Sequence, residues 1–140
     1  MAEQTILIAE DDPDIRDGVR ILLSGEGYHI IEAENGTRAL EVFRPEVDLV
    51  ILDIMMPEMR GDELCSTIKN DIETSHIPVL LLTALGEEQN ILDGLDIGAD
   101  EYIVKPFSVR ILKASVANLL ANRALLRSRY ANLEIEDTKV

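Results

Sequence analysis

The sequence of 140 residues has one cysteine, no tryptophan and few aromatic residues. Cys65 alone cannot form an internal disulfide or a metal site. No unbroken apolar run exceeds four residues, as in Val79 to Leu82, which excludes a membrane-spanning helix. No charged and apolar leader precedes Thr5, so we expect no secretory signal and a cytoplasmic location. With 46% apolar residues, the chain is expected to form one globular domain around a single core.

Basic residues are also scarce. The chain has 13 of them against 27 acidic residues, which gives a formal net charge of −14. Such a charge repels the phosphates of nucleic acids, so we expect no direct nucleic acid binding by this segment. It favours cations or basic partner surfaces instead.

Five short runs rich in apolar residues predict β-strands, and each is followed by residues with helical spacing. The predicted strands cover residues 5–9, 28–33, 48–53, 78–82 and 101–104. Helical spacing is found at 15–23, 39–43, 64–68 and 91–95, and from Ser108 to about Leu133. Asp12 is the expected N-cap of the first helix, because Pro13 suits its first turn. The alternation predicts an α/β fold, a doubly wound five-stranded parallel sheet of order 2-1-3-4-5, with an extended C-terminal helix.

Polar residues stand at the carboxyl ends of four predicted strands. Glu10 and Asp11 follow the first, Asp53 ends the third, Thr83 follows the fourth and Lys105 the fifth. Ligands of open α/β sheets bind at this edge, where the strand order reverses. Asp53 is therefore the first candidate for chemistry, although an aspartate before Pro57 could also serve only to cap a turn.

Three carboxylates that converge on one crevice cannot all stay ionised unless a cation neutralises them. Carboxylates, a backbone carbonyl and waters are the usual ligands of Mg²⁺. We therefore expect Mg²⁺ to be held by Asp11 and Asp53, with Glu10 acting mainly through water and the carbonyl of Met55 completing the site.

The hydroxyl of Thr83 and the ammonium of Lys105 fit a phosphoryl group attached to Asp53. Phosphoryl transfer depends on positioning and charge neutralisation, which a metal, a lysine and a threonine can share. Asp53 is then the nucleophile. The Lys105-Pro106 bond can be cis at small cost, which would aim the lysine.

These residues resemble the receiver domain of bacterial two-component response regulators, a family with a flavodoxin-like fold. The motifs that carry the resemblance are Glu10-Asp11, Asp53-Ile54-Met55-Met56-Pro57, Thr83-Ala84 and Lys105-Pro106-Phe107. The resemblance implies that Asp53 takes a phosphoryl group from a phosphohistidine of a histidine kinase, with Mg²⁺ required, and that the domain slowly dephosphorylates itself. It also implies that Tyr102 swings inward when Thr83 engages the phosphoryl group, which reshapes the face made by the fourth helix, fifth strand and fifth helix.

A narrower resemblance concerns residues 75–78 and the stretch from Gly98 to Arg129. They are similar to receivers in hybrid two-component proteins of gut Bacteroidetes, where sensor, kinase, receiver and a DNA-binding domain share one polypeptide. This resemblance implies an excised module whose output is transcription.

Two other kinds of protein share some of these features. Phosphatases of the haloacid dehalogenase type also use a strand-end aspartate, Mg²⁺, threonine and lysine, but they place an acid two residues after the nucleophile, where this chain has Met55. A flavodoxin-like flavin carrier needs a phosphate-binding loop after the first strand, where Glu10, Asp11 and Asp12 would repel the phosphate.

The end of the chain departs from a minimal receiver. We expect a receiver domain over residues 4–121 and a helical linker over 122–140 that leads toward an output domain. The apolar residues of the last helix follow heptad spacing, which predicts a homodimer through this helix or through the signalling face. They are Leu112, Val116, Leu119, Leu126, Tyr130 and Leu133. Arg123, Arg127 and Arg129 are expected to pair with acidic residues of a partner, and the alternative is a frayed tail.

Overall fold

A computed structural model gives the fold for residues 3–84 and 98–138, with side chains described up to Leu125 in the last helix. The described strands form one parallel sheet in the order β2-β1-β3-β4-β5. This is the predicted doubly wound α/β sheet, with β3 at its centre. Every residue of β3 is buried, because helices cover both faces of the sheet.

The bounds of the elements follow the predicted runs closely. The strands are β1 (Thr5–Ala9), β2 (His29–Ala33), β3 (Leu49–Asp53), β4 (Val79–Ala84) and β5 (Glu101–Lys105). The helices are α1 (Pro13–Gly25), α2 (Gly36–Val42), α3 (Gly61–Asn70) and α5 (Val109–Thr138). The helix predicted around residues 91–95 lies outside the described residues.

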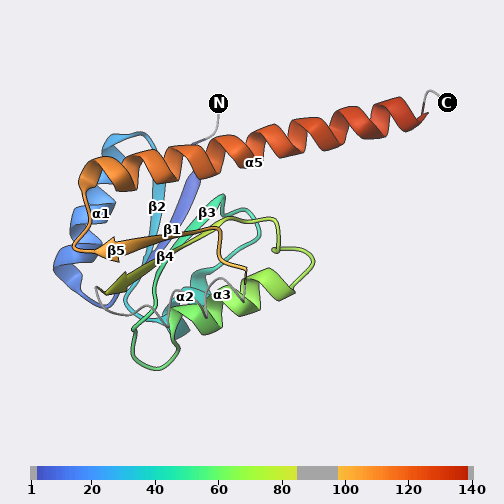
Figure 1. The fold of residues 1–140 in the computed structure, drawn as a ribbon. Coiled ribbons are helices and arrows are strands. Elements are labelled where there is room, and N and C mark those ends of the chain that lie inside the picture. Colours follow the sequence, from blue (N-terminus) through green and yellow to red (C-terminus); the bar gives the residue numbers. More distant parts are fainter. Residues whose placement is uncertain (1–2, 85–97, 139–140) are drawn as a thin grey trace.

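The two faces of the sheet carry two hydrophobic clusters. Helices α1 and α5 cover one face, and α2 and α3 cover the other (Figure 1). On the first face, Leu112 and Val116 of α5 pack with Ile6 and Ile51 of the strands. On the second face, residues of β1, β3 and β4 pack with α2 and α3. The strand ends between these layers are thereby held in fixed positions.

Polar side chains cap α1, α2 and α5, and the cap of α1 is the predicted one. The Asp12 carboxylate accepts hydrogen bonds from the backbone N–H groups of Asp14 and Ile15. Asn35 caps α2 in the same way, and the Ser108 hydroxyl accepts a hydrogen bond from the N–H of Arg110 at the start of α5. These caps satisfy backbone donors that the first helical turn leaves unpaired.

Helix α5 continues past the sheet and projects from the domain (Figure 1). It ends at Thr138, five residues beyond the predicted end at Leu133. Leu112 and Val116 of the predicted heptad pattern are buried in the core, and Leu119 packs against it. The side chains of Leu126, Tyr130 and Leu133 lie outside the described part. No helix within the described ranges is long and apolar enough to cross a membrane.

Arg123 does not remain available for a partner chain, and the prediction for this residue was wrong. Its side chain is buried, and its Nη1 atom lies 2.7 Å from the carbonyl oxygen and 3.0 Å from the carboxylate of Asp48. The Asp48 carboxylate also accepts a hydrogen bond from the N–H of Thr5. Arg123 therefore fastens α5 to the amino ends of β1 and β3.

Candidate functional site

The carboxyl ends of four strands bring the predicted site residues to one edge of the sheet. Glu10 and Asp11 follow β1, and Asp53 is the last residue of its neighbour β3. One carboxylate oxygen from each of Glu10, Asp11 and Asp53 lies within 4.8 Å of the others. Glu10 and Asp53 are buried, whereas Asp11 is exposed. The three carboxylates therefore form an acidic cluster that opens to solvent through Asp11.

Lys105 comes from the end of β5 and reaches into this cluster. Its Nζ atom lies 2.5 Å from Oε1 of Glu10 and 3.1 Å from Oδ2 of Asp53. The peptide bond between Lys105 and Pro106 is cis, as the sequence allowed. Burial lowers the pKa of Lys105, but the hydrogen bond to Glu10 and the negative charges of Asp53 and Glu10 outweigh it and raise that pKa. The ammonium is therefore charged at neutral pH.

Glu10 is fully buried beside Asp53, and burial together with that neighbour raises its pKa to about 8, although Lys105 acts in the opposite direction. Its second oxygen, Oε2, is buried without a hydrogen-bond partner among the described residues. An unpaired buried oxygen in a cluster of carboxylates fits a hard divalent cation. A cation there would favour the ionised form of Glu10. The donor set therefore fits Mg²⁺.

Thr83 and Tyr102 lie on the two strands beyond β3. Leu82 is the sheet partner of Asp53, so Thr83 stands one residue beyond the row of Asp53 in the sheet. The Thr83 side chain is buried, and its hydroxyl has no hydrogen-bond partner in the part of the chain described. Tyr102 on β5 is half-buried and packs against the hydrophobic cluster on the face of the sheet that α2 and α3 cover. A buried hydroxyl without a partner near Asp53 is available to a group attached there.

The loop between β3 and α3 lies tightly against Asp53. The backbone N–H of Met55 donates a hydrogen bond to Oδ1 of Asp53 at 3.3 Å. Met56 is buried, whereas the Met55 side chain is half exposed. A Cβ atom placed on Gly61 would lie 2.1 Å from the carbonyl oxygen of Asp53, so only glycine fits at this position. The loop thereby fixes the backbone that carries the carboxylate.

Arg16 on α1 contacts the backbone of the acidic cluster, and the sequence does not predict this contact. Its guanidinium donates a hydrogen bond from Nη1 to the backbone carbonyl oxygen of Glu10 at 2.7 Å. Its Nε atom lies 3.8 Å from the carboxylate of Glu32 on β2. No spacing rule predicts a contact between a helical side chain and a backbone carbonyl, so only the structure could reveal it.

An apolar groove ends beside Lys105. It has a volume of about 320 Å³ and lies between α1 and the start of α5. The residues that line it are Ile15, Gly18, Val19, Leu22, Lys105, Pro106, Phe107, Val109 and Leu112. The groove therefore joins an apolar surface to the edge of the acidic cluster.

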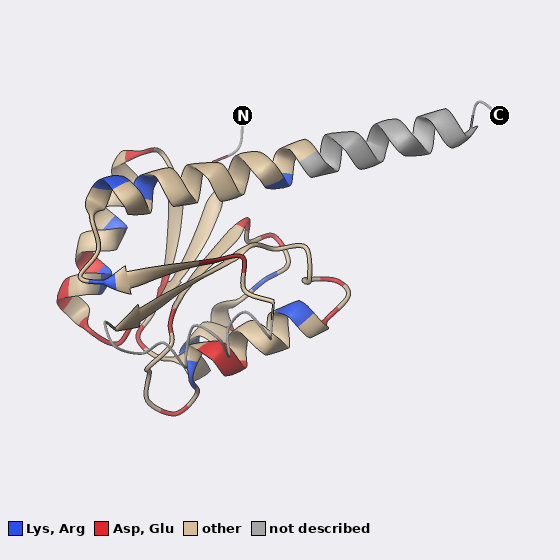
Figure 2. Cartoon of the chain, viewed as in Figure 1, with Lys and Arg blue, Asp and Glu red and all other residues tan. Residues whose placement is uncertain are grey.

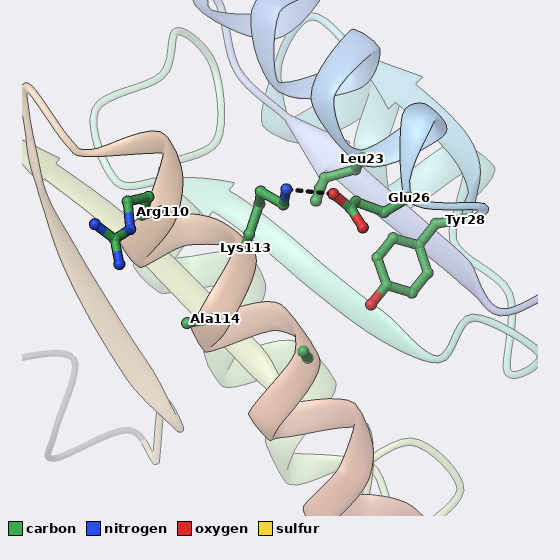
Figure 3. Close-up of a pocket in the computed structure, with 7 residues that line it drawn as sticks. Leu23, Glu26, Tyr28, Arg110, Lys113 and Ala114 are labelled. Carbon is green, nitrogen blue, oxygen red and sulfur yellow. Dashed lines mark ion pairs between the residues drawn. The ribbon is translucent and has the colours of Figure 1, made fainter.

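A second hollow between α1 and α5 lies at the opposite end of the sheet. Tyr28, just before β2, borders it together with Leu23 and Ala114, and its volume is about 370 Å³. Lys113 of α5 points across it to Glu26, and their charged atoms lie 2.5 Å apart (Figure 3). Burial and the charge of Glu26 raise the pKa of Tyr28. Because this hollow is at the amino ends of the strands, it is separate from the carboxylates.

Comparison with known proteins agrees with this geometry. The family model described as the response regulator receiver domain matches residues 6–117. A histidine kinase of Formosa agariphila is 47% identical over 131 residues, which are 93% of this chain and 10% of that protein. The phosphate regulon transcriptional regulatory protein PhoB of Pseudomonas aeruginosa is 44% identical over 86% of this chain and 53% of its own length. The chain thus spans between a tenth and about half of these curated relatives.

Solved structures show the same fold. The crystal structure of a putative response regulator from Chloroflexus aurantiacus superposes with a TM-score of 0.80 and 32% identity, over 86% of this chain and 99% of that one. The matched region of the family model contains the acidic cluster, Thr83 and Lys105. Fold, motifs and relatives agree, and the chain belongs to the response regulator receiver domain family of two-component phosphorelay systems.

Proposed function

We propose that Asp53 is the phosphoryl acceptor of this receiver domain and that a phosphohistidine of a histidine kinase is the donor. The observation that carries the proposal is the position of the Asp53 carboxylate. It is buried at the end of the central strand, 3.1 Å from the ammonium of Lys105 and next to the carboxylates of Glu10 and Asp11. Among the described aspartates, only Asp53 is buried, whereas Asp11 of the same cluster is exposed.

The reaction would exchange one bond to phosphorus for another. An oxygen of Asp53 attacks the phosphorus, the bond to the histidine nitrogen breaks, and the imidazole keeps the electron pair and takes up a proton. Lys105 is placed to move from the Asp53 carboxylate to a phosphoryl oxygen. The Thr83 hydroxyl, which lacks a partner among the described residues, is suited to another. Each donor then neutralises charge that develops in the transition state.

Mg²⁺ would be bound by Asp11 and Asp53, with Glu10 acting through water and the backbone carbonyl of Met55 as a further ligand. When bound, it would neutralise the negative charge shared by carboxylate and phosphoryl oxygens. Two observations support this assignment. The Oε2 atom of Glu10 is held in the interior without a hydrogen-bond partner among the described residues, and the exposed carboxylate of Asp11 can adjust its position to the metal.

The apolar groove beside Lys105 supports docking of a helix from the kinase. Amphipathic helices bind in grooves of this kind through a row of apolar residues. Because the groove ends at Lys105, a histidine on such a helix could reach Asp53. Dephosphorylation would be slow, since Met55 stands where the haloacid dehalogenase phosphatases have an acid, and its side chain cannot activate water.

The response to phosphorylation would run from Thr83 through Tyr102 to the face that includes β5 and α5. We further propose that the domain acts in the cytoplasm, forms a homodimer through this face or through α5, and controls transcription through an output domain. The relative from Pseudomonas aeruginosa, a transcriptional regulatory protein, supports that output.

Mass spectrometry of the intact chain after reaction with acetyl phosphate and Mg²⁺ tests the acceptor. We expect one added phosphoryl group, which chelation of Mg²⁺ prevents. Asp53→Asn removes the nucleophile and should abolish the adduct, whereas Asp17→Asn removes an exposed aspartate of α1 and should leave it unchanged. An adduct that persists in Asp53→Asn would assign the phosphoryl group to another residue.

A further inference from the structure

Arg16 fixes the short segment that presents two of the three carboxylates. Its Nη1 atom donates a hydrogen bond of 2.7 Å to the carbonyl oxygen of Glu10. That carbonyl belongs to the same planar peptide group as the N–H of Asp11. Arg16 therefore holds the peptide group that joins Glu10 to Asp11.

Hydrogen bonds also hold the chain just before and just after this peptide group, while Arg16 binds the peptide group itself. The N–H of Glu10 donates to the carbonyl of Ala33 on β2, which fixes the chain before the peptide. The Asp12 carboxylate caps α1 and fixes the chain after it. Asp11 itself is exposed, and no hydrogen bond to another described residue holds its side chain, so the orientation of its backbone decides where its carboxylate points.

The guanidinium is in turn held by Glu32. Nε of Arg16 lies 3.8 Å from a carboxylate oxygen of Glu32, and Nε of Arg20 lies 3.4 Å from the same oxygen. Arg16 is mostly covered, whereas Arg20 is more exposed and also pairs with Asp17. A planar guanidinium can serve a carbonyl and a carboxylate at once in fixed directions, which an ammonium cannot.

We infer that Arg16 is a positioning residue for the metal site: it orients the Glu10–Asp11 peptide so that the Asp11 carboxylate stands ready beside Asp53 to bind Mg²⁺. The inference rests on the proposed function, because it assumes that these carboxylates bind the metal. Residues that orient metal ligands commonly change metal affinity by about ten- to a hundredfold when they are replaced.

Charge and geometry predict opposite effects of removing Arg16. If its charge were what mattered, Arg16→Met would tighten Mg²⁺ binding, because a positive charge near the site would be gone. If its hydrogen bond matters, the same substitution weakens binding. Arg20→Met is the matched control, since it removes a positive charge from the same Glu32 carboxylate but has no contact with the Glu10 carbonyl.

The experiment is an NMR titration of the full chain with Mg²⁺. We expect the dissociation constant to rise about tenfold in Arg16→Met and to stay unchanged in Arg20→Met. Arg16→Lys keeps the charge but not the planar donor group, and should also weaken binding. Equal or tighter binding in Arg16→Met overturns the inference. If that variant does not fold in urea-denaturation controls, wild-type affinity in Arg16→Lys overturns it instead.

Two further readouts separate positioning from general stability. In the metal-free protein, the Asp11 amide should shift and exchange faster in Arg16→Met than in Arg20→Met. With acetyl phosphate, Arg16→Met should need about tenfold more Mg²⁺ for half-maximal phosphorylation, with the wild-type rate at saturating Mg²⁺. A wild-type chain that binds no Mg²⁺ would refute the proposed function, whereas an unchanged Asp11 amide would refute only the role of Arg16.

Discussion

Glu10 is more deeply buried than any other charged side chain in the described part of the chain. The nearby Lys105 provides one positive charge for the three carboxylates of Glu10, Asp11 and Asp53. When all three are ionised, the cluster keeps two negative charges, which one divalent cation balances. If Asp53 is the acceptor, as proposed, a phosphoryl group on it would add further negative charge, and both Lys105 and a divalent cation would be needed to balance it.

The site residues with side chains at strand ends could be predicted from the sequence, whereas Arg16 could not. Asp53, Thr83 and Lys105 follow runs of apolar residues, and parallel strands bring their ends to one edge. Arg16 acts on a backbone carbonyl, and this contact depends on the path of the loop after β1. Nothing in the identity or spacing of the residue specifies that path.

Cys65 offers a prediction at the level of a single residue. Its thiol is fully buried in the core, and burial raises its pKa from 9.0 to about 11. Because the reactive form is the thiolate, a raised pKa leaves about a hundredfold less of it below pH 9. We expect the native chain to react with a thiol reagent at pH 8 at least that much more slowly than the unfolded chain.

The control for this measurement is the chain in denaturant, which should react with one equivalent of reagent, since the sequence has one cysteine. The native rate should rise with pH up to about 11 as the thiolate forms. A native rate close to the denatured one at pH 8 would mean that solvent reaches Cys65 by opening of α3.

At the level of elements, apolar runs were sufficient to predict the described strands, and Asp12 and Ser108 marked the starts of α1 and α5. The starts of α2 and α3 lie three residues before the first residue with helical apolar spacing, so the spacing alone did not predict them. The exact start of β2 was less predictable. The N–H of Tyr28 bonds to the carbonyl of Leu23 in the turn after α1, so the strand begins one residue later, at His29. Such turn bonds compete locally with the sheet.

The strand ends also support a prediction about the switch. Thr83 and Tyr102 stand on neighbouring strands, and Thr83 pairs with Val104 in the sheet. If the Thr83 hydroxyl moves to a phosphoryl oxygen, Tyr102 can follow into the space behind it, and β5 and the start of α5 should change. We expect beryllofluoride with Mg²⁺ to shift amide NMR signals of Thr83, Tyr102 and the first turns of α5.

Thr83→Val serves as the control, because it keeps the shape of the side chain and removes the hydroxyl. It should still bind beryllofluoride at Asp53 while the shifts on β5 and α5 become much smaller. Shifts confined to the surroundings of Asp53 in the wild type would show that this face does not respond.

For the whole molecule, the contacts that hold α5 on the domain determine which part of this helix can move relative to the sheet. Arg123 ties the helix to Asp48, and Lys113 ties it to Glu26 (Figure 3). From Val109 to Leu125, where its side chains are described, α5 carries basic residues and no acidic ones (Figure 2). The sequence pattern predicted that a long helix exists, but it could not show that Arg123 belongs to the domain, because its partner Asp48 is 75 residues away in the chain.

The end of α5 projects from the domain (Figure 1). Beyond Leu125 the helix continues for 13 residues to Thr138, or about 20 Å at the rise of an α-helix. A single helix of this length is marginal in water, so a second copy or a following domain is expected to stabilise it. We expect the full chain to dimerise through this segment, more strongly with beryllofluoride bound.

Sedimentation of the full chain and of a version that ends at Leu125 measures this contribution. The shorter version keeps Arg123 and its bond to Asp48, so the receiver domain remains intact and only the projecting segment is lost. It should sediment as a monomer at concentrations where the full chain with beryllofluoride is dimeric. If the two versions dimerise equally, the interface lies on the domain itself, and if both remain monomers under all conditions, the projecting helix requires a different partner.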